Sequence, residues 1–89
     1  MKKADINWIK GSKQNFDKER YEEALRYLEK RKDSIRSHAG VTGIWVASRH
    51  GEPYIMVALE PGLGEEAKKS IPDRLGKYEV YYVEGTFHL

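Results

Sequence analysis

Apolar and polar residues recur along this 89-residue chain with two different periods, one in each half. In the first half, apolar positions are spaced by three, four and seven residues, the period of a helix with one buried face. These positions are Tyr21, Leu25, Leu28, Ile35 and Ala39. Asp17 is a favourable N-cap residue, and Gly40 suits the position that follows a helix C-terminus. The pattern therefore predicts one long helix over residues 17–38.

The second half follows the two-residue period of β-strands. Residues 42–49 and 54–60 predict two strands. The intervening Gly51 and Pro53 are turn residues that join them. We therefore expect a β-hairpin over residues 42–60.

Three further segments complete the predicted order of elements. Residues 65–75 favour a short helix, which Pro72 interrupts, and residues 78–84 favour a last strand. Residues 1–15 are polar and irregular, or supply a short edge strand around residues 5–10. The resulting order αββαβ, or βαββαβ with that first strand, is that of a partial or complete ferredoxin-like plait. We therefore expect an α+β domain with its helices on one face of the sheet.

The strand alternation sorts the side chains of the sheet onto two faces. The face expected to meet the helices carries Ile44, Val46, Ile55, Val57, Leu59, Val80 and Tyr82. The opposite face is expected to carry Trp45, Tyr54, Met56, Tyr81 and Val83. Large apolar and aromatic groups gathered on an exposed face usually mark an interaction site, so these five residues are the candidate partner-binding set.

The sequence leaves three alternatives for what covers this aromatic face. The first is the chain itself, if residues 1–16 fold back with Trp8, Ile9 and Phe16 as apolar contacts. The second is another copy of the chain, and the third is a different protein. The main expectation is a small, non-catalytic interaction module that self-associates as a homodimer through this face.

Composition narrows the class of protein. The length is that of one domain, with a modest core. No cysteine is present, which excludes disulfides, thiolate metal sites and a cysteine nucleophile, and fits a reducing, cytoplasmic location. The N-terminal residues lack the apolar run of a signal peptide, and no window is long enough for a membrane span. Sixteen basic and 14 acidic residues give a net charge of +2, which does not predict general polyanion binding.

The polar residues do not assemble a recognisable catalytic or metal site. His38, His50 and His88 lack the spacing of metal ligands, and no acid, base and nucleophile set is apparent. We therefore expect neither an enzyme nor a cofactor. Aromatic residues on a plait sheet are also how RNA-recognition modules stack bases, so RNA binding is an alternative. The basic-Gly-aromatic motif of those modules is absent, and this disfavours a nucleic-acid partner.

Several short motifs lie between Gly40 and Gly85. They are Gly40-Val41-Thr42-Gly43-Ile44, Ile55-Met56-Val57, Ile71-Pro72, Val80 and Val83-Glu84-Gly85. Together they resemble a non-catalytic segment that precedes the protease domain in some bacterial trypsin-like peptidases. The resemblance covers about half of the chain. Because the catalytic residues of that family lie outside this segment, the resemblance implies an accessory role without catalysis.

A second resemblance concerns the C-terminal strand. The run Val80-Tyr81-Tyr82-Val83-Glu84, followed by a short tail, is similar to the end of subtilisin-type propeptides. In that family the tail enters the cleft of the protease. The resemblance implies that residues 86–89 form an inhibitory tail, so a serine protease inhibitor is the first alternative function.

Overall fold

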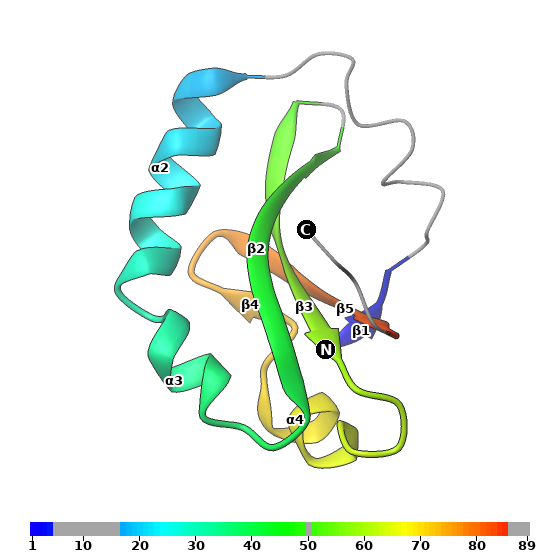
Figure 1. The fold of residues 1–89 in the computed structure, drawn as a ribbon. Coiled ribbons are helices and arrows are strands. Elements are labelled where there is room, and N and C mark those ends of the chain that lie inside the picture. The colour runs from blue at the N-terminus through cyan, green and yellow to red at the C-terminus, as the bar shows by residue number, and fades with distance from the viewer. Residues whose placement is uncertain (5–16, 50, 86–89) are drawn as a thin grey trace.

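The computed structural model describes residues 1–4, 17–49 and 51–85 (Figure 1). Within them, three helices pack on a five-strand mixed sheet, which makes the fold α+β. The helices are α2 (Lys18–Glu29), α3 (Lys32–Arg36) and α4 (Glu65–Ser70). The strands are β1 (Lys2–Lys3), β2 (Val41–Arg49), β3 (Glu52–Leu59), β4 (Arg74–Leu75) and β5 (Tyr78–Glu84).

The order of strands in the sheet is β1-β5-β3-β2, and β4 also pairs with β5. β2 and β3 form the expected antiparallel hairpin, whereas β5 runs parallel to both β3 and β1. In a ferredoxin-like plait, a strand from the first half of the chain separates the two strands that the second helix connects. Here those two strands, β3 and β5, are direct neighbours, and β1 lies at the outer side of β5. The predicted plait is therefore wrong at the level of strand order.

The first strand and the short helix also differ from their predicted ranges. β1 lies at Lys2–Lys3, and residues 5–10 fall outside the described residues. Helix α4 ends at Ser70, because the chain then turns at Pro72 into β4, which pairs back onto β5. The predicted extension of this helix to Leu75 is therefore wrong.

The long helix predicted over residues 17–38 is broken in two (Figure 1). Asp17 is its N-cap as expected, since its side chain accepts a hydrogen bond of 3.1 Å from the Arg20 amide. The break falls at Arg31, whose φ of −122° departs from the helical value. The Arg31 guanidinium lies 3.7 Å from the centre of the Tyr27 ring and donates to the Tyr27 carbonyl. This side chain thus satisfies a carbonyl that the interrupted helix leaves without an intrahelical partner.

The buried stripe of the helices is only partly the predicted one. Leu28 and Ile35 are buried, but the Leu25 side chain is 40% exposed. Ala24 is fully buried in its place. Ala24 and Leu28 are four residues apart and share the buried face of α2, so the neighbouring Leu25 lies at the side of that face.

The core between helices and sheet contains the predicted apolar face. Val46, Ile55, Val57, Leu59 and Val80 are buried there, and Ile44 and Tyr82 pack against them. Ala24, Leu28 and Ile35 cover this face from α2 and α3, while Ala67 and Ile71 cover it from α4 and the loop after it. The assignment of strand residues to this face is therefore confirmed.

The N-terminal strand is held at both ends. The Met1 amino nitrogen donates to the carbonyl oxygens of Lys68 and Ile71, at 2.9 and 3.1 Å. It also lies 3.3 Å from the Asp73 carboxylate. At the other end, the Ala4 amide donates to the Tyr82 carbonyl. Among the described segments, no helix has the length and apolar content needed to cross a bilayer.

Candidate functional site

The five candidate partner-binding residues lie together on the sheet face that points away from the helices. Trp45 pairs across the strands with Met56, which in turn pairs with Tyr81. Among the described residues, the cluster on this far face contains Ala4, Trp45, Ala47, Tyr54, Met56, Ala58, Tyr81 and Val83. The strand alternation therefore placed these side chains correctly, because register and pleat together determine which face a residue occupies.

The far-face cluster is not the exposed patch that the sequence led us to expect. Met56 is 0% exposed, Tyr54 and Val83 are buried, and Trp45 and Tyr81 are half-buried. Among the described residues, the large exposed apolar side chains are instead Leu25 and Leu63. The far face thus resembles a second core layer, and its role in binding a partner stays a prediction.

The segments expected to act on this face are only partly described. Ala4 is buried in the far-face cluster, so the first residues of the chain do reach it. The proposed cover by Trp8, Ile9 and Phe16 lies outside the described residues, as does the proposed inhibitory tail at residues 86–89.

A second feature of the described sheet is its terminal strand, β2. β2 spans nine residues and lies at the end of the strand order, with β3 on one side only. Its sequence from Val41 to Ser48 contains neither a charged residue nor a proline. Natural edge strands usually carry such residues, because an unprotected edge pairs with other chains. The sequence predicted this strand, but only the strand order identifies it as an edge.

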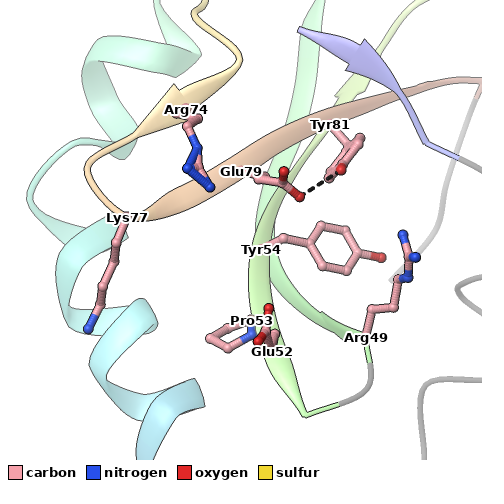
Figure 2. Close-up of a pocket in the computed structure, with 8 residues that line it drawn as sticks. All are labelled: Arg49, Glu52, Pro53, Tyr54, Arg74, Lys77, Glu79 and Tyr81. Atoms are coloured by element: carbon pink, nitrogen blue, oxygen red, sulfur yellow. Dashed lines mark hydrogen bonds between the residues drawn. The ribbon is translucent and has the colours of Figure 1, made fainter.

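A third feature is a pocket of about 330 Å³ beside the β2–β3 turn, which Figure 2 shows. This volume is at the lower end of the range for small-molecule sites. Its described lining residues are Arg49, Glu52, Pro53, Tyr54, Arg74, Lys77, Glu79 and Tyr81. Only Tyr54 and Tyr81 belong to the predicted site. The charged members come from β2, β3, β4, β5 and the β4–β5 turn, so no local motif in the sequence indicates that they meet.

The pocket lies where the pairing of the two central strands begins. Parallel pairing of β3 with β5 starts at Ile55 and Val80, so Pro53 and Tyr54 precede it. Pro53 has no N–H with which to extend the ladder toward a neighbouring strand. The lining residues Glu52, Pro53 and Glu79 thus precede the first residues that pair between β3 and β5.

Two tyrosines form the inner wall of this pocket. The rings of Tyr54 and Tyr81 meet edge to face, with centroids 5.4 Å apart. The Tyr81 hydroxyl donates a 2.7 Å hydrogen bond to Glu79, and this bond raises the pKa of the Tyr81 phenol. Burial raises the pKa of Tyr54, although the nearby Arg49 charge opposes the shift. Because an ordinary tyrosine already titrates near pH 10, both phenols are neutral at physiological pH.

The cationic residues of the pocket differ in their partners. Lys77 forms an ion pair of 2.6 Å with Glu23 on α2. Arg74 lies directly opposite Glu79 in the β4–β5 pair, yet no described carboxylate oxygen lies within 4.0 Å of its guanidinium. A second pocket, of about 350 Å³, shares Glu52, Pro53 and Lys77 with the first. No group of three potential metal ligands occurs within the described residues.

The comparisons with known proteins add no family to this picture. No family model, curated protein or solved structure matches the chain.

Proposed function

We propose that this chain is a small, non-catalytic interaction domain that self-associates, and that it does so by pairing its β2 edges. The observation that carries the proposal is the nine-residue terminal strand without charge or proline before Arg49. A strand edge of this kind offers a row of backbone donors and acceptors to another chain. This moves the proposed contact from the far face, where Met56 is buried, to the rim of the sheet.

A second copy suits this edge because β2 is nearly symmetric about its centre. Trp45 is the middle residue of Val41–Arg49, and antiparallel self-pairing about a two-fold axis there places Trp45 beside Trp45. In the same register Gly43 lies opposite Ala47, and Ile44 lies opposite Val46.

This register also keeps the two faces of the sheet in phase. Residues that are directly opposite in an antiparallel pair share a face. Ile44 and Val46 both belong to the helix-facing core, while Trp45 and Ala47 both belong to the far-face cluster. Self-pairing would therefore continue both apolar layers across the interface.

The test compares two added lysines. Thr42 is exposed on the β2 edge, and Ser70 is exposed at the end of α4. We expect the wild-type chain to have the solution mass of a dimer in light scattering at about 100 µM, within the range of common weak associations. Thr42→Lys should yield a folded monomer, because lysine on an edge strand opposes pairing. Ser70→Lys, which adds the same charge elsewhere, should remain dimeric.

Two results would contradict the proposal. A wild-type chain that stays monomeric at this concentration would refute self-association itself. A Thr42→Lys variant that dimerises like the wild type would show that the contact does not involve the β2 edge. Circular dichroism of each variant establishes that the fold is retained.

A further inference from the structure

We propose that the pocket beside the β2–β3 turn binds a small oxyanion, a carboxylate or phosphate group, with Arg74 as the principal ligand-binding residue. This inference goes beyond self-association. It rests on different residues, since the pocket draws on β3, β4 and β5 as well as on the last residue of β2.

The first argument is the charge of the pocket lining. Arg49, Arg74 and Lys77 bring three cations from separate segments, against the two carboxylates of Glu52 and Glu79. The described lining carries one net positive charge, although its Lys77 ammonium is already paired with Glu23 on α2. In Figure 2, Arg49 and Arg74 lie on different sides of the tyrosine pair, and Glu79 lies between Arg74 and the rings. An anion in this space would face cationic groups on more than one wall.

The second argument concerns Arg74 itself. Oppositely charged residues that face each other on adjacent antiparallel strands ordinarily attract, and Arg74 faces Glu79. The Glu79 carboxylate is instead hydrogen-bonded to the Tyr81 hydroxyl. No described carboxylate is within 4.0 Å of the Arg74 guanidinium, which is exposed. The planar guanidinium group thus presents donors in the fork geometry that suits a carboxylate or phosphate.

The third argument is the neutral aromatic wall. Tyr54 and Tyr81 keep their protons at physiological pH, so they add no negative charge next to the site. Their edge-to-face contact holds the two rings in a defined arrangement. The remainder of the ligand, to which the oxyanion is attached, would contact these two rings.

The experiment titrates the full chain with inorganic phosphate and, separately, with acetate, and follows Arg74, Tyr54 and Tyr81 by NMR. Chemical-shift changes that saturate and that centre on these residues are expected with at least one probe. The probe that binds more tightly identifies phosphate or carboxylate as the preferred source of the oxyanion. Arg74→Gln should weaken that binding about tenfold or more, because hydrogen bonds between charged groups are stronger than those between neutral groups.

A matched control separates a specific site from general attraction. Lys69→Gln removes one exposed cation from α4, outside the pocket lining. This variant should bind the probe as the wild type does. Equal weakening by Arg74→Gln and Lys69→Gln would overturn the proposal, and so would the absence of saturable shifts with both probes at 20 mM, which is roughly twentyfold above a millimolar Kd.

Discussion

Two glycines with almost the same backbone conformation allow a sharp test of how the loops around α4 are packed. Gly40 has φ of 85° and Gly62 has φ of 84°, values in the left-handed region. A Cβ atom on Gly40 would collide with the backbone carbonyl oxygen of Leu63 and would lie 2.9 Å from the Gly64 nitrogen. A Cβ atom on Gly62 would meet no atom within 4 Å. Alanine substitutions at the two positions therefore differ mainly in this collision.

The expected magnitudes follow from these geometries. A left-handed conformation costs an L-residue about 1–2 kcal/mol, and the reduced freedom of the unfolded chain offsets about 0.4–1 kcal/mol of this. Gly62→Ala should therefore lower the free energy of unfolding by about 1 kcal/mol. Gly40→Ala suffers the same strain and also an overpacking cost of about 1–3 kcal/mol against backbone atoms that cannot rotate away. We expect a total loss of about 2–4 kcal/mol, a large share of the roughly 4–13 kcal/mol typical of a domain this size.

The measurement is urea unfolding of the wild type and both variants, followed by circular dichroism. Gly40→Ala should have a clearly lower midpoint than Gly62→Ala, with similar slopes for all three proteins. The Gly40 carbonyl also accepts a 2.8 Å hydrogen bond from the Glu60 amide, so the strain is concentrated where two loops meet. If the two variants have equal stability, the close approach of Gly40 to Leu63 is refuted.

Two further predictions concern the core and the tyrosine wall. Leu28→Ala should lower the free energy of unfolding by about 2–5 kcal/mol, because the Leu28 side chain is buried. Leu25→Ala makes the same change on the same helix at a side chain that is 40% exposed, and it should lower this free energy much less. Equal losses of stability in thermal unfolding would contradict the orientation of α2. The hydrogen bond to Glu79 raises the pKa of Tyr81, so it contributes its whole stabilisation below about pH 10, the usual pKa of tyrosine. This contribution is lost as the pH rises through the pKa that Tyr81 has in the folded protein. The stability difference between wild type and Tyr81→Phe, measured by urea unfolding at pH 8 and pH 11, should therefore shrink at the higher pH, and a constant difference would count against this bond.

Local patterns in the sequence were sufficient for most of the secondary structure. Asp17 identified the start of α2, and β5 spans the residues predicted for the last strand. The two-residue period also assigned the strand side chains to the correct faces, because alternation is a property of the strand backbone itself. The break at Arg31 was not predictable in this way. The apolar spacing of the helix continues through the break, and the contact of the Arg31 side chain with Tyr27 leaves no mark on that spacing.

Three features were decided by tertiary structure alone: the strand order, the burial of the far face and the pocket. β3 and β5 pair through residues as distant in sequence as Ile55 and Val80, and a strand pattern does not specify its neighbours. This pairing leaves β2 as an edge of the described sheet and brings Arg74 and Arg49 to one pocket. The two-residue alternation likewise predicts which face of the sheet Met56 occupies. Whether Met56 is buried there depends on which other segments of the chain pack against that face. The sequence by itself therefore determined the elements and their faces, whereas exposure, edges and cavities arose only from contacts between segments far apart in the chain.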